Sequence, residues 1–141
     1  MAETDPKGPL VGVKVLDFTI YQNGPSATGR LAELGAEVLK VEPDGGEPVR
    51  LNPSFISAKT GFNSGFEAFN RGKKSITIDL KHEKAKDIVK RLVQWADVLC
   101  ENFKVGVLDR LGFSYEVCSG WNPRLIYCQN SGSHHELHAP T

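Results

Sequence analysis

The chain has 141 residues, of which 40% are hydrophobic, and its 17 basic residues equal its 17 acidic residues in number. This length is enough for one domain with a core of its own. The neutral balance provides no overall field to attract nucleic acid or an anionic membrane, and no apolar run approaches the roughly 20 residues of a membrane-spanning helix. The sequence therefore indicates a globular protein without a nucleic-acid or membrane partner.

The cysteines and the N-terminus bear on where the protein is located. Cys100, Cys118 and Cys128 form no C-x-x-C pair, and their odd number fits a reducing compartment. The opening segment MAETDPKG is polar and lacks the apolar core of a signal peptide. We expect a cytoplasmic protein, with mitochondrial or peroxisomal import left open. Cys100 and Cys128 lie in apolar strand patterns, so we expect both to be buried.

The stretch from Gly12 to Pro43 predicts a strand, a turn, a helix and a second strand. Residues 13–18 form a short apolar run, as in a strand buried on both faces. Pro25 suits the first turn of the following helix, because its missing N–H costs nothing there. Gly35 is placed to end that helix, and residues 38–41 form the next strand. A unit of this length implies parallel strands joined by a right-handed crossover.

The rest of the chain continues to alternate between strands and helices. Residues 43–66 are rich in proline and glycine and predict a long irregular loop. Residues 82–96 carry apolar side chains at helical spacing and form the clearest predicted helix. The remaining predicted elements are strands over 75–80, 98–100 and 125–128, a short helix over 104–111, and a helix that begins after Ser114 and ends at Gly120.

This alternation predicts an α/β fold, a Rossmann-like layered domain with a mainly parallel sheet. We expect a flexible N-terminal tail over 1–8, one domain over 9–132 and a divergent tail over 133–141. No G-x-G-x-x-G follows the first strand and no Walker sequence is present, so nothing in the sequence supports NAD or ATP. The fold class by itself assigns no function.

Polar residues follow two of the predicted strands at their carboxyl ends. Gln22 and Asn23 come after the first strand and precede a helix, where amide groups can donate to carbonyls or phosphates. Asn102, Phe103 and Lys104 follow a later strand and combine an amide, an aromatic face and a cation. Ligands bind at this edge of open α/β sheets, so both groups are candidates for a binding site. Each also fits an ordinary polar loop.

A basic run at Arg71, Lys73 and Lys74 surrounds Gly72. Three cations around a glycine could hold a phosphate. As an isolated signal this run is more typical of a solvated turn.

Several motifs recur in order along the chain, and together they are specific although each alone is weak. They are VLDFT, QNGP and LAELGAEVLKVEP within 15–43, FNRGKKSITIDL at 69–80, ADVLCENF at 96–103, GVLDRLGFSYE at 106–116 and NPRLIYCQNSG at 122–132. In this order the chain resembles the N-terminal portion of the family III CoA-transferases, the group of formyl-CoA transferase and carnitine CoA-transferase. The resemblance covers about residues 9 to 132.

The resemblance implies an activity and a set of ligands. Family III enzymes move CoA between an acyl-CoA donor and a carboxylic acid acceptor through an aspartyl acyl-enzyme, and full-length relatives are homodimers. Coenzyme A or an acyl-CoA is thus expected as substrate, with no metal. The residues that match the family's CoA-binding positions are Gln22, Asn23, Ile78, Asp79, Leu80, Lys81, Asn102, Phe103, Lys104 and Arg110.

The sequence departs from the family pattern at two places. Some members carry an arginine that packs on the CoA adenine at the position of Pro43. Many other members have proline at this position, as this chain does. The segment after Gly132 does not match the GYD-like motif that carries the catalytic aspartate, so we assign no catalytic residue. The tail also holds His134, His135, Glu136 and His138, which are a poor metal site because no framework preorganises them.

Three functional interpretations follow from these departures. The chain is a truncated CoA-transferase, a non-catalytic CoA-binding or dimer-interfering short isoform, or a fragment of a 2-methylacyl-CoA racemase, which uses an acid–base pair. The matching segments are shared too widely to separate transferase from racemase.

Overall fold

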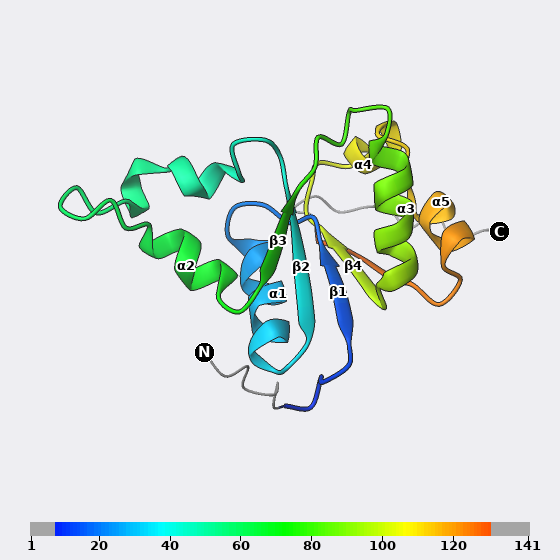
Figure 1. Ribbon diagram of the computed structural model, residues 1–141, viewed down its shortest axis with the longest axis horizontal. Coiled ribbons are helices and arrows are strands. Elements are labelled where there is room, and N and C mark those ends of the chain that lie inside the picture. Colours follow the sequence, from blue (N-terminus) through cyan, green and yellow to red (C-terminus); the bar gives the residue numbers. More distant parts are fainter. Residues whose placement is uncertain (1–7, 131–141) are drawn as a thin grey trace.

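The computed structural model of the chain describes residues 8–130 and shows one parallel sheet of five strands. The strand order is β3-β2-β1-β4-β5, and every neighbouring pair is parallel. The predicted α/β class is confirmed (Figure 1). The strands are β1 (Lys14–Asp17), β2 (Glu37–Glu42), β3 (Lys74–Thr77), β4 (Val98–Glu101) and β5 (Ile126–Gln129).

The first crossover forms as its residues predict. Helix α1 (Asn23–Glu33) begins directly after the Gln22 turn and carries Pro25 in its first turn. Gly35 has φ +100° and donates its backbone N–H to the carbonyl of Ala32 at 3.0 Å, which ends the helix. β2 then pairs in parallel with β1, with Lys14 opposite Glu37 at the start of the paired segment.

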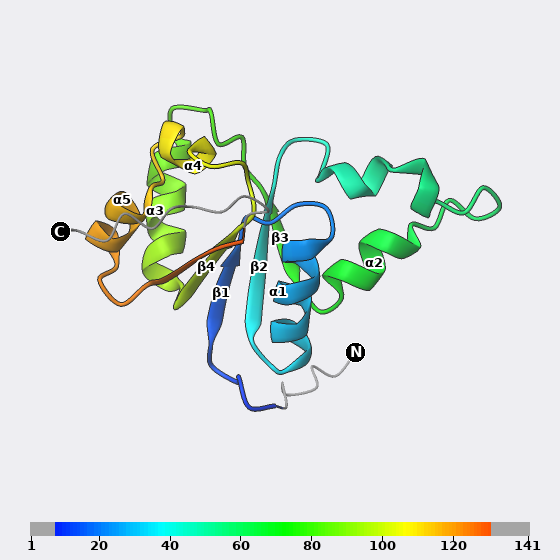
Figure 2. The same cartoon turned by 180° about the vertical axis from the view of Figure 1, so that it is seen from behind.

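Helices cover both faces of the sheet because the strand order reverses direction at β1. The chain moves outward from β1 to β3, with α1 and α2 (Ser64–Asn70) as connections. It then crosses back to β4 and β5 through α3 (Ala85–Trp95), α4 (Val107–Arg110) and α5 (Tyr115–Trp121). Right-handed crossovers that run in opposite directions place their helices on opposite faces. Figures 1 and 2 show α1 on one side of the sheet and α3 and α5 on the other.

The core has two parts, one on each face of the sheet, and alternation along β1 separates them. Leu16 and Phe18 join the larger cluster under α3 and α5, whereas Val15 joins the smaller cluster beside α1. The larger cluster also holds Val89 and Val93 of α3, both fully buried. The apolar face predicted for this helix therefore packs against the sheet.

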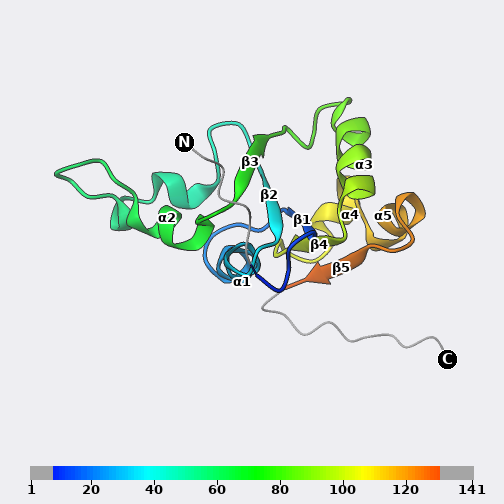
Figure 3. The ribbon, with the colours of Figure 1, turned by 60° about the horizontal axis from the view of Figure 1, so that its bottom comes forward.

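The segment predicted as an irregular loop over 43–66 is more ordered than expected. It holds two 3-10 turns, η1 (Pro48–Leu51) and η2 (Pro53–Phe55), and the start of α2. Asn63 begins α2, because its side-chain oxygen accepts a hydrogen bond from the Phe66 N–H at 2.8 Å. Seven residues are too few to show a helical period in the sequence. Figure 3 shows these segments projecting beyond the β3 side of the sheet.

Two further expectations are corrected at the level of single elements. Cys128 is exposed, because β5 lies at the edge of the sheet in the described residues, whereas Cys100 in β4 is buried as expected. β3 ends at Thr77 rather than Leu80, because the Asp79 carboxylate accepts the Lys81 N–H at 2.9 Å and starts a turn. Within residues 8–130 no helix has the length and apolar character needed to cross a membrane.

Candidate functional site

A cleft of about 680 Å³ opens at the carboxyl ends of the strands, on the side that α3 covers. β1 and β4 are neighbours whose connections leave in opposite directions, and ligands of open α/β sheets bind at such a switch point. The volume lies within the range of about 300–1,000 Å³ that suits small-molecule ligands. The cleft is lined by Phe18, Ile20, Val41, Glu42, Pro43, Asp44, Pro48, Thr77, Ile78, Asp79, Leu80, Lys81, Phe103, Val107 and Leu111.

Five of the ten residues proposed as CoA ligands line this cleft. Ile78, Asp79, Leu80 and Lys81 follow β3, and Phe103 follows β4. The two groups follow strands that are not neighbours in the sheet, and the parallel direction of all the strands brings both groups to one edge. Their side chains supply apolar walls, one carboxylate and one ammonium group. The cleft is thus suited to a long ligand that is part apolar and part charged.

Several apolar residues of the cleft were absent from the sequence prediction. Phe18 and Val41 belong to the buried core as well as to the cleft wall, and Leu111 packs against that core. Core-forming and ligand-facing apolar residues look alike in a sequence. The available signal was their position at or just beyond strand ends.

The other five predicted residues do not line the cleft. Gln22 is the N-cap residue of α1, makes no side-chain capping hydrogen bond and is exposed. Asn23 exchanges two side-chain hydrogen bonds with Asn130, of 3.0 and 3.3 Å. Lys104 and Arg110 are exposed, and each is adjacent in sequence to a lining residue.

Asn102, the fifth of these residues, binds the backbone of the β1 loop. Its side-chain oxygen accepts the Ile20 N–H at 2.7 Å, and its amide nitrogen donates to the Ile20 carbonyl at 2.8 Å. Both polar atoms of the side chain are thus engaged within the protein. Because Ile20 lines the cleft, Asn102 shapes the site through that residue.

The turn between β1 and α1 is held by two more buried side chains. Lys40 on β2 donates from Nζ to the Thr19 carbonyl at 2.7 Å. The Glu47 carboxylate accepts the Tyr21 N–H at 3.0 Å, and burial raises the pKa of this carboxyl group. With Asn102 on Ile20, three successive residues are fixed by side chains from three other parts of the chain. The turn is therefore preorganised before any ligand arrives.

The basic run at 71–74 does not form an exposed phosphate clamp. The Lys73 side chain is only 2% exposed, and its ammonium group pairs with the fully buried Asp17 carboxylate at 2.9 Å. Burial lowers the pKa of Lys73, and the charge of Asp17 opposes that shift. Lys73 also donates to the Pro25 carbonyl and to Asn70. Its charge therefore ties the start of β3 to β1 and α1.

Glu42 and Arg50 form a second charged pair at the border of the cleft. The Arg50 guanidinium donates to both Glu42 carboxylate oxygens, at 2.6 and 2.8 Å, and lies 3.6 Å from the Phe66 ring centroid. Burial would raise the pKa of Glu42, but hydrogen bonds from Arg50 and the Glu47 backbone lower it to about 2. This pair fixes the loop that carries Pro43 and Pro48 into the cleft wall.

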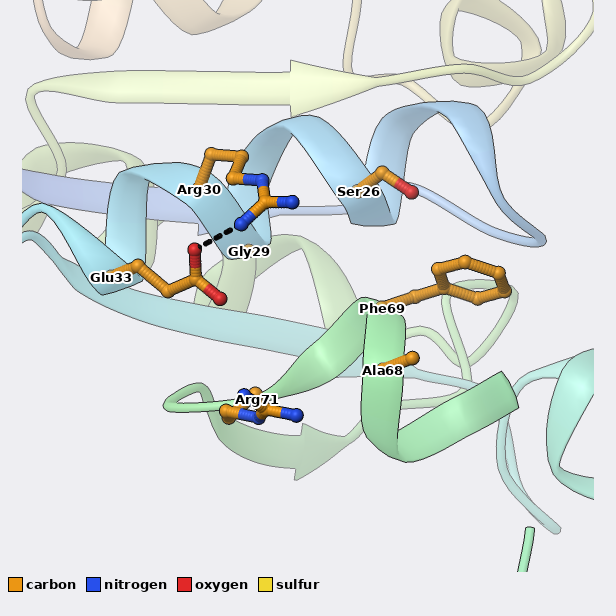
Figure 4. A pocket seen from close by; sticks show the side chains of 7 residues that line it. All are labelled: Ser26, Gly29, Arg30, Glu33, Ala68, Phe69 and Arg71. Carbon is orange, nitrogen blue, oxygen red and sulfur yellow. Dashed lines mark hydrogen bonds and ion pairs between the residues drawn. The ribbon is translucent and has the colours of Figure 1, made fainter. Parts of the chain in front are cut away.

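A smaller hollow of about 200 Å³ lies between α1 and α2, on the side of the sheet opposite α3 (Figure 4). Arg30 and Glu33 of α1 form an exposed ion pair at 2.5 Å across one side of it. Gly29 permits the close contact, because a side chain there would come within 2.8 Å of the Phe69 carbonyl oxygen. The hollow is too small for a ligand of the size that suits the cleft.

Within residues 8–130 no group of three or more His, Cys, Asp or Glu side chains could hold a metal ion. The histidines considered in the tail lie outside the described residues.

The parallel sheet, with helices on both faces and a cleft at the switch point, has the architecture of a doubly wound α/β fold. The chain belongs to CoA-transferase family III, which it matches over residues 10–134. It is 45% identical over 136 residues to acetyl-CoA:oxalate CoA-transferase of Acetobacter aceti, a match over 94% of this chain and 34% of the relative. It is 43% identical to succinate–glutarate CoA-transferase of Agrobacterium fabrum, over 89% of this chain and 33% of the relative.

Solved structures agree with this assignment. A structure of Rv3272 from Mycobacterium tuberculosis aligns with a TM-score of 0.84 at 40% identity, over 93% of this chain and 36% of the other. A CAIB/BAIF family protein from Brucella suis aligns with a TM-score of 0.78 at 44% identity, over 86% and 33% of the two chains. The chain thus spans about a third of the length of the relatives it matches.

Proposed function

We propose that the chain supplies the CoA-binding part of an enzyme that transfers CoA from an acyl-CoA to a carboxylic acid. One observation carries this proposal: the cleft at the switch point is lined by five residues that the family resemblance assigns to CoA. The relatives named above act on acetyl-CoA with oxalate and on succinate with glutarate.

The chemistry of the cleft supports a CoA-like ligand. Its apolar walls suit an adenine ring or a pantetheine arm, and the Phe103 side chain offers a face for stacking. Lys81 lies in the cleft wall, while Lys104 and Arg110 are exposed beside it. In the proposed complex these three cations hold the phosphates, and exposed placement suits them because phosphates are strongly hydrated.

We infer that acyl transfer needs residues that this 141-residue sequence does not supply. The resemblance assigns the nucleophile to an aspartate in a segment that this sequence does not match. The expected behaviour of the 141-residue chain is therefore CoA binding without turnover. Measured transfer of CoA from acetyl-, succinyl- or formyl-CoA to an acid by the purified chain would contradict this inference.

Calorimetric titration of the purified chain with CoA tests the proposal. We expect saturable binding of CoA, and weaker binding of adenosine or pantetheine alone, because each fills only part of the cleft. Leu80→Asp places a carboxylate in the cleft wall and is expected to abolish binding. Lys81→Ala is expected to weaken binding by about tenfold, as loss of one charged hydrogen bond does.

Lys59→Ala is the matched control, because Lys59 is exposed and does not line the cleft. It should bind CoA as the unmodified chain does. A folded chain that binds no CoA, or one for which Lys59→Ala and Lys81→Ala weaken binding equally, would contradict the proposal.

A further inference from the structure

Tyr21 adopts a backbone conformation that its residue type disfavours. Its φ is +65°, and among residues 8–130 it is the one non-glycine residue with a positive φ. A residue with a bulky side chain is an outlier in this left-handed region, and such strain gathers at functional sites. Tyr21 stands between Ile20, which lines the cleft, and Gln22, the N-cap residue of α1. The unusual conformation therefore lies at the border of the proposed CoA site.

The side chain of Tyr21 does not account for this conformation. It is 54% exposed and the structure gives it no hydrogen bond within the described residues. The backbone is held instead, because the Tyr21 N–H donates to Oε2 of Glu47 at 3.0 Å. The two residues are 26 positions apart in sequence. A long-range contact thus fixes what the local sequence disfavours.

Burial of the Glu47 carboxylate carries a free-energy cost. It is fully buried, and its second carboxylate oxygen, Oε1, has no hydrogen-bond partner within the described part of the chain. A buried polar group that lacks a partner costs about 1–3 kcal/mol, so such groups call for an explanation in function or ordered water. A smaller apolar residue would fill this position at lower cost if packing were its only purpose.

The position of Glu47 is itself secured by charged neighbours. Its backbone N–H donates to the Glu42 carboxylate at 3.1 Å, and Arg50 binds the same carboxylate. The charge of Lys40 stabilises the Glu47 carboxylate, and the Lys40 ammonium binds the adjacent Thr19 carbonyl. Glu47 is therefore placed firmly enough to impose a conformation on Tyr21.

We propose that Glu47 is a positioning residue, whose buried carboxylate holds Tyr21 in the left-handed conformation and so orients the adjacent Ile20 in the wall of the cleft. This inference rests on the proposed CoA-binding function. Glu47 does not line the cleft and touches no ligand; it acts through the Tyr21 peptide.

Rescue by glycine separates this role from a merely structural one. Glycine adopts positive φ without the penalty that Tyr21 bears. If Glu47 acts by enforcing that conformation, replacing Tyr21 with glycine should restore what Glu47→Ala loses. If Glu47 only supports packing, Tyr21→Gly cannot compensate for its removal.

The experiment combines hydrogen exchange of the Tyr21 amide, followed by NMR, with CoA titration. For Glu47→Ala we expect exchange of this amide to speed up by up to about tenfold, as loss of one hydrogen bond permits, and CoA affinity to fall several-fold. The double variant Glu47→Ala/Tyr21→Gly should recover CoA affinity. The matched double variant Glu47→Ala/Tyr21→Ala should not, because alanine keeps the penalty of positive φ.

Unchanged exchange and CoA affinity in Glu47→Ala would overturn the proposal, as would equal CoA affinity in the two double variants. If Glu47→Ala does not fold, Glu47→Gln and Glu47→Met replace it, because glutamine keeps an oxygen acceptor and methionine does not. Slow Tyr21 exchange in the glutamine variant alone supports the proposal, and equal exchange in both overturns it. If the unmodified chain binds no CoA, the proposed function fails, whereas the exchange comparison still decides the role of Glu47 at Tyr21.

Discussion

The side-chain amide of Asn102 hydrogen-bonds both polar groups of Ile20, at 2.7 and 2.8 Å, and so joins the loops that follow β4 and β1. These strands are neighbours in the sheet, and the two loops diverge beyond this point. The pair therefore links the two loops at the carboxyl edge of the sheet, beside the cleft that Ile20 lines.

This relationship predicts the behaviour of two substitutions. Asn102→Ala leaves both Ile20 groups without their partner, so the free energy of unfolding should fall by about 1–3 kcal/mol. Asn102→Asp keeps the acceptor, but at neutral pH it opposes a carboxylate to the Ile20 carbonyl oxygen. Because a protonated aspartate can donate again, the loss relative to the unmodified chain should shrink as the pH falls. Chemical denaturation at several pH values measures both effects, and a loss that grows on acidification would refute the assignment.

The buried pair of Lys73 and Asp17 predicts a large stability effect. Lys73→Met leaves the fully buried Asp17 carboxylate without its ion partner, and breaking such a pair costs about 3–5 kcal/mol. Lys74→Met is the matched control, because Lys74 is 71% exposed where it pairs with Glu37, and an exposed pair contributes only about 0–1 kcal/mol. Denaturant midpoints compare the two variants, and equal losses would contradict the buried placement of Lys73.

Glu42 predicts a specific pH dependence. Its pKa is about 2 in the folded protein against 4.5 as the ordinary value, so its ionised form contributes stability. That contribution is complete above about pH 4.5 and is lost as the pH falls toward 2. The difference in unfolding free energy between the unmodified chain and Glu42→Gln should therefore narrow on acidification. For Glu37→Gln, in an exposed pair, the difference should stay within about 0–1 kcal/mol.

Two helical glycines predict opposite effects of an added methyl group. Gly29→Ala would place Cβ 2.8 Å from the Phe69 carbonyl oxygen, so α1 and α2 must separate. We expect a loss of about 1–3 kcal/mol, as for other overpacked sites. Gly120→Ala in α5 meets nothing within 4 Å and should gain about 0.5–1 kcal/mol from helix propensity. Thermal denaturation of both variants checks the sign of each effect.

The sequence alone determined the succession of the five strands and of the helices other than α2, and its motifs identified the family. Apolar spacing over 13–18 and 82–96 reports local periodicity, which depends only on neighbouring residues. The end of α1 at Gly35 was predictable for the same reason, since one glycine supplies the required conformation. Helix α2 escaped prediction because seven residues do not establish a period.

Only the tertiary structure decided what the polar residues do. The basic run predicts an exposed cation at Lys73. In the structure its side chain is buried and pairs with the buried Asp17, which is 56 residues away. Asn102 is predicted from the sequence to bind a ligand, and the fold adds a partner that the sequence did not indicate, Ile20, which is 82 residues away. The sequence carried no signal for the hydrogen bond between Glu47 and Tyr21, because the two residues are 26 positions apart and the folded loop brings them together. Local patterns fix secondary structure, whereas the partner of a buried charge or amide depends on which strands the sheet places side by side.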